Sequence, residues 1–298
     1  MGAVLLAVAL MSPAGPVPAS ARHADGTSRS ARVPVRPGSA RARAATIMCA
    51  KVAAKAGFSF DRTVTTRKGP QPQIVVAIAV AMAESGCTSG ATNVNAGGSV
   101  DRGLWQINSR WHPEVSDRCA FQIQCNANAS WIISGHGADW SPWSTFKSGA
   151  WTPYLADARA AIAGGFTFLL GNEGAGTCLN ADGAAMAISQ RVCDPGDGRQ
   201  QWTVLSAAVG SPPILRNAAT GSCLDWDGAR TALLACDATD AGQRLSFLGT
   251  GRLNTNGNAD ALIQNRHDGP CVVADRAGAG KPVWPRACDS GDTLQMWN

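Results

Sequence analysis

A motif of asparagine, glycine and cysteine occurs three times in the C-terminal part of the chain, and it strongly constrains the fold. The copies read Asn172-x₃-Gly176-x-Cys178-Leu179, Asn217-x₃-Gly221-x-Cys223-Leu224 and Asn265-x₃-Gly269-x-Cys271-Val272. Each copy has a second cysteine and closes near Gln-x-Trp, at Cys193 and Gln200-Gln201-Trp202, Cys236 and the degraded Gln243-Arg244-Leu245, and Cys288 and Gln295-Met296-Trp297. The copies begin 45 and 48 residues apart. Such a period indicates a repeat architecture in which each unit supplies one supersecondary element.

With its cysteines paired inside each unit (178–193, 223–236 and 271–288), this array resembles the ricin-type β-trefoil lectin domain over residues 166–298. The resemblance implies an all-β fold in which Gln-x-Trp packs around a pseudo-threefold axis and does not contact sugar. A sugar-binding lobe of that family has an Asp after Cys-Leu, an aromatic residue two positions before the second cysteine, and an Asn before the Gln of Gln-x-Trp.

Most of these sugar-binding positions are substituted here. The Asp position holds Asn180, Asp225 and Val273, the aromatic position holds Arg191, Leu234 and Arg286, and the Asn position holds Arg199, Gly242 and Leu294. Asp225 is therefore the candidate carbohydrate-binding residue of the trefoil, with Trp226 or Trp284 as substitutes for the missing aromatic ring. Two interpretations stay open: a trefoil that binds wall polysaccharides, and a structural or wall-docking spacer.

A second feature lies upstream: ten residues without a polar side chain, Ile74–Ala83, lie shortly after Pro72 and directly before Glu84. A run that is apolar on all sides predicts a helix buried in a core. Glu84 would then sit at the end of a buried helix, where desolvation and the negative end of the helix dipole disfavour the charged carboxylate. A glutamic acid that keeps its proton near neutral pH suits general-acid catalysis.

Asp101 follows seventeen residues later, in a Gly- and Asn-rich segment that predicts turns and short strands. In such a polar environment we expect Asp101 to stay ionised. Two carboxyl groups in opposed environments are typical of glycoside cleavage. Taken singly, however, a Glu at a helix end is usually a solvated cap and an Asp before Arg-Gly is usually a turn residue.

The segment from Glu84 to Trp111 resembles the active-site core of c-type lysozymes without a gap. The residues that match are Glu84, Ser85, Ala91, Thr92, Asn93, Asn95, Ser99, Asp101, Gly103, Gln106, Ile107, Asn108, Ser109, Arg110 and Trp111. The resemblance implies that Glu84 is the general acid and Asp101 the nucleophile or electrostatic stabiliser. By position in the motif, Asn95, Ser99, Gln106 and Asn108 are candidates to hydrogen-bond Asp101 or the substrate. Trp111 is predicted to contact the glycan, and Trp140 to form the wall of the apolar pocket around Glu84.

The cysteines of this region depart from the c-type pattern. Glu84-Ser85-Gly86-Cys87, the phrase Gly-Leu-Trp-Gln-Ile-Asn from residue 103 and the Asn-Ala-Asn-Ala run from residue 126 also resemble bacterial lytic transglycosylase and phage-type lysozyme-like domains. Four cysteines allow three pairings; we predict Cys119–Cys125, because they are close in sequence, and then Cys49–Cys87. The fold class is therefore multi-domain: a mainly α lysozyme-like (α+β) catalytic domain at 46–163, with helices over 47–57, 126–134 and 154–163, followed by the all-β trefoil.

The N-terminal part predicts export. Residues 1–21 carry no charge and combine an apolar run, Ala3–Met11, with Ala19-Ser20-Ala21, which fits a signal peptide too short to span a bilayer. An even number of cysteines, ten, suits an exported and oxidised protein. Residues 22–45 are Arg-rich and predict a disordered basic linker. The alternative for this segment is an arm attracted to anionic wall polymers; it has no aromatic residue for stacking bases, so no nucleic acid partner is expected.

Together these features predict a secreted, cell-wall-associated peptidoglycan hydrolase (muramidase), which cleaves the β-1,4 bond between N-acetylmuramic acid and N-acetylglucosamine. The alternatives are a lytic transglycosylase that leaves anhydro-muramyl products, and a non-catalytic protein that binds the wall or carbohydrate. The expected partners are peptidoglycan glycan strands, and other wall polysaccharides through the trefoil. No cofactor, membrane association or oligomer is expected, and no metal, because His112 and His136 have no partners at ligand spacing.

Overall fold

The computed structural model describes residues 36–183, 186–226, 229–253, 259–266 and 268–298. The predicted signal peptide (1–21) and most of the predicted linker (22–45) lie outside these residues. Within the described residues, no helix combines the length and the apolar composition that a membrane span requires.

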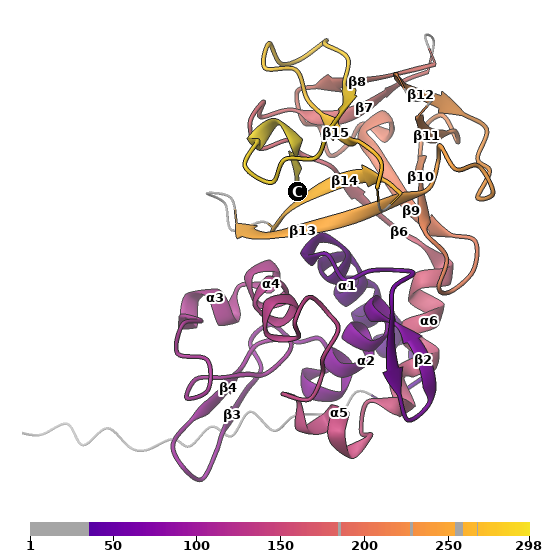
Figure 1. The fold of residues 1–298 in the computed structure, drawn as a ribbon. Coiled ribbons are helices and arrows are strands. Elements are labelled where there is room, and N and C mark those ends of the chain that lie inside the picture. Colours follow the sequence, from indigo (N-terminus) through magenta and orange to yellow (C-terminus); the bar gives the residue numbers. More distant parts are fainter. Residues whose placement is uncertain (1–35, 184–185, 227–228, 254–258, 267) are drawn as a thin grey trace, which may run out of the picture. The chain divides into compact units, whose positions relative to one another are not determined.

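The first half of the described chain is mainly helical (Figure 1). Its helices are α1 (Ala40–Ala56), α2 (Gln73–Ser85), α3 (Asp117–Phe121), α4 (Ile123–Ile133), α5 (Ser144–Ser148), the 3₁₀ helix η1 (Thr152–Tyr154) and α6 (Leu155–Gly164). Helix α2 contacts both α1 and α6, and every residue from Ile74 to Ala81 is fully buried. The predicted buried helix is thereby confirmed. Small side chains on the buried face of α1, such as Ala50 and Ala53, let the two helices approach closely.

Helix α1 begins earlier than predicted. Ser39 is its N-cap, because the Ser39 hydroxyl accepts a hydrogen bond from the Ala42 amide at 3.1 Å. Ala42 is buried inside the region assigned to the disordered linker. The prediction of disorder was therefore wrong for residues 40–45. Although the segment is Arg-rich, these residues form the N-terminal part of α1, which is capped by Ser39 and packs one Ala-containing face against the core. The helix ends at Gly57, which adopts a left-handed conformation (φ 101°).

Two small antiparallel sheets complete the first half. One is the hairpin of β1 (Thr63–Thr66) and β2 (Gly69–Pro72). The other has the order β3-β4-β5, made of Thr92–Val94, Val100–Arg102 and Ile107–Asn108. Asp101 lies on the central strand of this second sheet.

A buried side chain of α4, Asn126, holds the turn after β4. Its amide nitrogen donates to the carbonyl oxygens of Arg102 (3.1 Å) and Ala120 (2.8 Å), and its oxygen accepts from the Trp105 amide (3.0 Å). Gly103, within this turn, has φ +73°, and a Cβ there would lie 2.0 Å from the Ala120 oxygen. The end of the strand that carries Asp101 is therefore fixed against α4.

The second half is a β structure with three equivalent units. Its elements are β6 (Phe166–Leu169), β7 (Cys178–Asp182), β8 (Ala187–Arg191), η2 (Gly198–Gln200), β9 (Gln201–Ser206), β10 (Pro213–Asn217), β11 (Cys223–Trp226), β12 (Thr231–Leu234), β13 (Leu245–Leu253), β14 (Ala259–Asn265), β15 (Cys271–Val273), β16 (Trp284–Arg286), η3 (Thr293–Gln295) and β17 (Met296–Trp297). One sheet has the order β6-β9-β10-β11-β12-β8-β7. The other has the order β13-β14-β15-β16, with β17 pairing β14.

The Gln-x-Trp residues form the centre of these units, as predicted. Trp202 and Trp297 are buried, and their indole N–H groups donate to the carbonyl oxygens of Leu179 (2.9 Å) and Val272 (3.0 Å). Leu245 fills the equivalent place in the second unit and is fully buried. The tryptophans therefore pack the core, and the fold class of a helical region followed by an all-β region is confirmed.

The asparagine that opens each repeat ties its unit to the preceding one. Its amide nitrogen donates to backbone oxygens near the preceding Gln-x-Trp: Asn217 to Arg199 (2.7 Å), and Asn265 to Arg244 (3.1 Å). Asn172 of the first unit donates to Leu294 of the third at 2.9 Å. The three links close a ring, which explains the recurrence of this asparagine with the repeat.

All ten cysteines form disulfides, and the predicted pairing is confirmed. The bonds are Cys49–Cys87, Cys119–Cys125, Cys178–Cys193, Cys223–Cys236 and Cys271–Cys288. The first joins α1 to the residues that follow α2.

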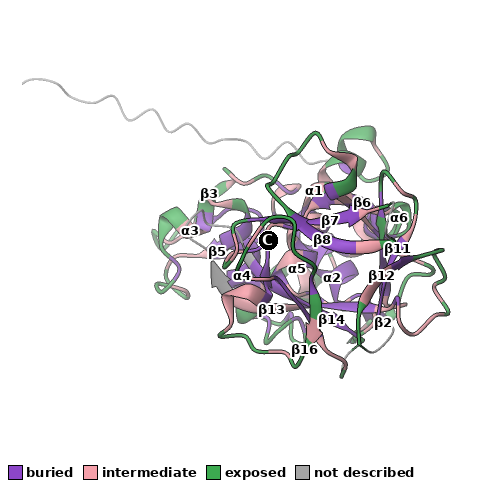
Figure 2. Ribbon diagram, turned by 90° about the horizontal axis from the view of Figure 1, so that it is seen from above, coloured by how far each residue is buried: buried purple, intermediate pink, exposed green. Residues whose placement is uncertain are grey.

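Strand β13 contacts α1 and α4. A Cβ on Gly249 would lie 2.0 Å from the Ala56 carbonyl oxygen, so the two backbones touch directly. Buried apolar residues of the helical and β regions form one cluster, which includes Phe60 and Phe166 with ring centroids 6.4 Å apart. In Figure 2 the buried colour marks α2 and the strands β7 and β8, whereas many connecting loops are exposed.

We predict that Gly103→Ala lowers the free energy of unfolding by about 3 kcal/mol or more, because the added Cβ meets the Ala120 oxygen and strains a left-handed residue. Gly98→Ala is the matched control: its φ is +78°, but nothing lies within 4 Å of its Cβ, so a loss of about 1 kcal/mol is expected. Denaturant unfolding with the disulfides intact measures both. Equal losses would show that the turn can yield to the new methyl group.

Candidate active site

A pocket of about 440 Å³ opens between the end of α2, the β3–β4–β5 sheet and the residues that precede α5. Its volume is in the range of pockets that bind small molecules or part of a polymer. Six of the nine predicted site residues line it: Glu84, Asn95, Asp101, Gln106, Asn108 and Trp111. Both predicted catalytic carboxyl groups therefore face one cavity.

Glu84 is in the last turn of α2 and is 7% exposed. One of its carboxyl oxygens, Oε1, accepts a hydrogen bond from the Thr145 hydroxyl of α5 at 2.6 Å. The helix ends at once, because Gly86 adopts a left-handed conformation (φ 62°). The Ser85 hydroxyl donates to the Leu104 carbonyl oxygen at 2.7 Å, which fastens the helix end to the turn after β4.

Asp101 is held by its two neighbouring strands. In the sheet register it lies directly opposite Asn93 on β3 and Asn108 on β5. Side chains directly opposite each other in an antiparallel sheet project to the same face. The Asn108 amide donates to Oδ1 at 2.6 Å and the Asn93 amide donates to Oδ2 at 3.0 Å, so each carboxylate oxygen has its own donor.

A second set of hydrogen bonds positions these two amides. The Ser99 hydroxyl accepts from the amide nitrogens of Asn108 (3.1 Å) and Asn95 (3.3 Å), and the Asn95 oxygen accepts from Asn93 (3.3 Å). The Asn108 oxygen accepts from the backbone amide of Trp111 at 3.3 Å. Ser99 does not line the pocket itself and acts through the asparagines, whereas Asn95 does both.

Gln106 has mainly a backbone role. Its side chain is buried, and its amide nitrogen donates to the carbonyl oxygens of Ala91 (2.9 Å) and Gly103 (2.8 Å). Its φ is +50°, which is unusual for a residue other than glycine. We infer that the two hydrogen bonds of the Gln106 side chain stabilise the β4–β5 turn beside the pocket.

The tryptophan that lines the pocket beside Glu84 is Trp143 rather than the predicted Trp140. Trp140 is 1% exposed and stacks on Phe58, with its ring centroid 4.9 Å from that of Trp143. The Trp143 indole donates to the Trp105 carbonyl oxygen at 2.7 Å. The tryptophan in the pocket wall is therefore Trp143, three residues after the predicted Trp140, because Trp140 packs in the core. Trp111 is at the pocket and is 75% exposed.

Three residues of the site were missing from the sequence prediction: Asn93, Trp143 and Thr145. Asn93 had a signal, because the turn-forming Asn95–Ser99 between Val94 and Val100 predicts a hairpin that pairs Asn93 with Asp101. Thr145 had none, because it is 61 residues from Glu84 and meets it only in the folded chain.

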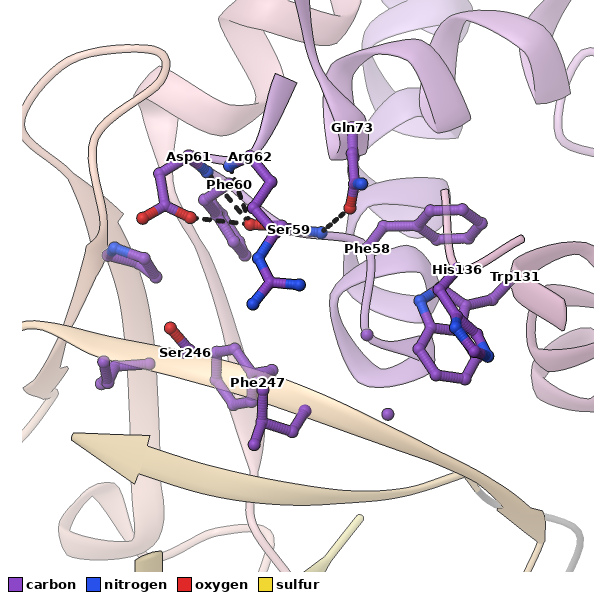
Figure 3. A pocket seen from close by; sticks show the side chains of 15 residues that line it. Phe58, Ser59, Phe60, Asp61, Arg62, Gln73, Trp131, His136, Ser246 and Phe247 are labelled. Carbon is purple, nitrogen blue, oxygen red and sulfur yellow. Dashed lines mark hydrogen bonds between the residues drawn. The ribbon is translucent and has the colours of Figure 1, made fainter. Parts of the chain in front are cut away.

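Figure 3 shows a different pocket, of about 90 Å³, between the residues that follow α1, the end of α4 and strand β13. Its polar groups bond one another: the Ser59 hydroxyl donates to Asp61 at 2.7 Å, and the Ser59 amide donates to Gln73 at 3.3 Å. The cavity is too small for a sugar ring with its substituents. It is a gap in packing, and the larger pocket is the candidate active site.

The trefoil candidate Asp225 is 4% exposed, and a Cβ on Gly242 would lie 2.9 Å from its Oδ2. Trp226 is also buried (5% exposed), whereas Trp284 on β16 is 40% exposed. Trp284 lies opposite Val273 in the strand register. Residues two apart on a strand face the same side, so Trp284 shares a face with Arg286, which occupies the aromatic position of the third lobe.

Among the described residues there is no group of three His, Cys, Asp or Glu side chains that could hold a metal ion. His112 has Glu114 as a partner, with 3.0 Å between Nδ1 and Oε1, and this hydrogen bond helps to lower the pKa of Glu114 after a backbone hydrogen bond, which is the larger cause.

Two protein families match the chain. Residues 50–145 match the family described as "Lysozyme like domain", and residues 150–236 match the family described as "Ricin-type beta-trefoil lectin domain-like". A search of curated proteins finds no match.

Several solved structures match a part of this chain. The designed threefold-symmetric protein ThreeFoil is 19% identical, with 44% of this chain and 96% of that chain covered and a TM-score of 0.36. A ricin B-like lectin of Macrolepiota procera in complex with lactose is 21% identical, with 45% and 94% covered and a TM-score of 0.35. The hemolytic lectin CEL-III is 20% identical, with 45% and 29% covered and a TM-score of 0.36.

Because these TM-scores are low, the solved structures do not assign the two halves of the chain. The assignment rests on the two family matches and on the pocket and disulfides described above. The helical half and its pocket agree with the first match, and the three disulfide-closed units agree with the second. The chain thus joins a lysozyme-like domain to a ricin-type β-trefoil lectin-like domain.

Proposed function

We propose that this protein is a muramidase that hydrolyses the β-1,4 bond between N-acetylmuramic acid and N-acetylglucosamine in peptidoglycan, with retention. The observation that carries the proposal is the pair of carboxyl groups in one pocket: Glu84 is buried beside Thr145, and Asp101 is held between two amides. Such a pair divides the work of glycoside cleavage between an acid and an anion.

Glu84 is the general acid. Burial at 7% exposure disfavours a charged carboxylate. Its Oε1 accepts the Thr145 hydrogen bond, which orients the carboxyl group that carries the proton. From there the proton passes to the glycosidic oxygen as the bond to the sugar breaks.

Asp101 supplies the negative charge opposite the developing oxocarbenium ion, as nucleophile or electrostatic stabiliser. The amides of Asn93 and Asn108 donate to its two oxygens and hydrogen-bond its charged form. They also fix the direction of the carboxylate before substrate arrives, which is how preorganised charge lowers a barrier. Water then completes hydrolysis.

A lytic transglycosylase is the alternative reaction, in which the muramyl 6-hydroxyl and not water completes the reaction. That chemistry needs no second carboxylate. The two amide donors on Asp101 support hydrolysis, because they hold a second carboxylate in place at the pocket that contains Glu84. A non-catalytic wall-binding protein is disfavoured for the same reason.

We further propose a secreted, monomeric, wall-associated protein without cofactor or metal. Five disulfides are typical of extracellular proteins. The trefoil would contact wall polysaccharide through the third lobe, where Trp284 is accessible on the face of the expected aromatic residue, rather than through the buried Asp225.

Glu84→Gln is expected to lower the rate of wall digestion about a thousandfold, because the Gln amide has no acidic proton to transfer to the leaving oxygen. Asp101→Asn should lower it about a hundredfold, because it removes the stabilising charge. Glu173→Gln, the same chemical change in the β region, is the control. Mass spectrometry of the released muropeptides checks the reaction: reducing muramyl ends support hydrolysis, and anhydro-muramyl ends would establish transglycosylation instead.

Thr145→Val should lower kcat/KM about tenfold and move the alkaline limb of its pH profile to higher pH. The hydroxyl bonds a carboxylate more strongly than a neutral acid. Loss of the Thr145 hydroxyl therefore disfavours the ionised form of Glu84, so that Glu84 keeps its proton to higher pH. Thr46→Val, which removes a buried hydroxyl bonded to the Arg43 carbonyl oxygen, is the control. An unshifted pH profile would exclude Thr145 from this role.

Trp284→Ala should reduce retention of the intact protein on insoluble wall glycan about fivefold, because the exposed indole stacks on sugar faces. Val192→Ala, at a position 73% exposed, is the control for loss of an exposed apolar side chain. Sedimentation with purified walls gives the bound fraction. Retention that survives Trp284→Ala unchanged would support the spacer role of the trefoil.

A further inference from the structure

A second groove, of about 750 Å³, shares a wall with the active-site pocket. Pro142, Trp143 and Ser144 line the pocket, whereas Asp139, Ser141 and the residues from Phe146 onwards line the groove. The segment from residue 139 to residue 149 therefore borders both. We name this second site the α5 groove, and its lining is Thr65–Lys68, Asp139, Ser141, Phe146–Gly149, Trp151 and Thr152.

The α5 groove has a basic rim over an aromatic floor. Arg67 and Lys68 are the two residues between β1 and β2, and Lys147 is on α5; all three are exposed. The floor contains Phe146 and Trp151, whose rings stack with centroids 5.3 Å apart. Three flexible cations over a rigid base fit an anionic ligand with several charges.

The charge of the rim is not neutralised by neighbouring acids. In the described part of the chain, Arg67, Lys68 and Lys147 take part in no ion pair. Asp139 is the acid in the lining, and its two oxygens accept from the Ser141 amide (2.8 Å) and hydroxyl (2.9 Å). The groove thus presents three cations against one internally bonded carboxylate.

The groove is close to the acid that breaks the bond. Thr145 donates to Glu84, whereas Lys147, two residues further along the same helix, projects from another side of α5. A group covalently attached to a sugar in the pocket has only this one segment, residues 139–149, to cross before it meets the groove. Covalent attachment to the bound sugar also raises the effective concentration of that group at the groove, whereas a separate polymer gains no such increase.

From this juxtaposition we infer that the α5 groove binds the carboxylates of the peptide that is attached to the muramyl residue, so that the protein prefers peptide-bearing glycan. The inference rests on the proposed function, because it needs a muramyl sugar in the adjacent pocket. Wall phosphodiester polymers share the negative charge, but they are not joined to the sugar held beside Glu84.

The test compares kcat/KM on two soluble glycans from which phosphate polymers have been removed, one with its peptides and one stripped of them by an amidase. The test variant is Arg67→Glu with Lys68→Glu and Lys147→Glu. The control is Arg41→Glu with Arg43→Glu and Arg216→Glu, which makes the same change of charge at exposed positions outside the groove.

Wild-type protein should cleave the peptide-bearing glycan faster. The groove variant should lose about tenfold on that glycan and nothing on the stripped one, and the difference should shrink with added salt. Unchanged activity on stripped glycan also shows that the variant is folded. The control variant should keep the wild-type preference.

An equal loss on both glycans, or no loss on either, overturns the inference. A third substrate, peptide-stripped glycan that still carries its phosphate polymer, tests the other anion. If the groove variant loses activity only on that substrate, the groove binds phosphate and the inference is overturned. Wild-type protein that cleaves neither glycan overturns the proposed function itself, and the inference with it.

Discussion

Burial of α2 on all sides is the constraint on which the lysozyme-like domain depends. Eight consecutive residues, Ile74 to Ala81, have no exposed surface, so α1 and α6 must pack around them. This arrangement places Glu84 where the buried helix meets the pocket. A carboxyl group gains its distinctive chemistry there from position alone, because its neighbours on the helix are apolar.

Asp101 obtains the opposite environment from a sheet of three short strands. The register of β3, β4 and β5 brings one asparagine to each side of the carboxylate. That register depends in turn on the β4–β5 turn, which Asn126 and Gln106 hold through backbone oxygens. The two carboxyl groups are thus positioned by different kinds of structure, a helix and a sheet, and α5 touches the acid from a third direction.

Much of this was predictable where the signal is local or repeated. The apolar run gave α2, the threefold motif gave the three disulfide-closed units, and the cysteine spacing gave Cys119–Cys125. Contacts between distant segments that no cysteine pair or motif marks were not predictable: neither Thr145 on Glu84 nor the use of Trp143 in place of Trp140 has a trace in the sequence. The start of α1 was not predicted because the Arg-rich composition favours disorder, whereas in the folded chain Ser39 caps the helix.

The touching backbones of Ala56 and Gly249 have a consequence for the modular history of the chain. A lectin domain is often regarded as a cassette that moves between proteins on a flexible tether. Here a trefoil with any side chain at the position of Gly249 would collide with the end of α1. A different trefoil joined to this helical half would therefore keep the contact only if it also carries glycine at that one place.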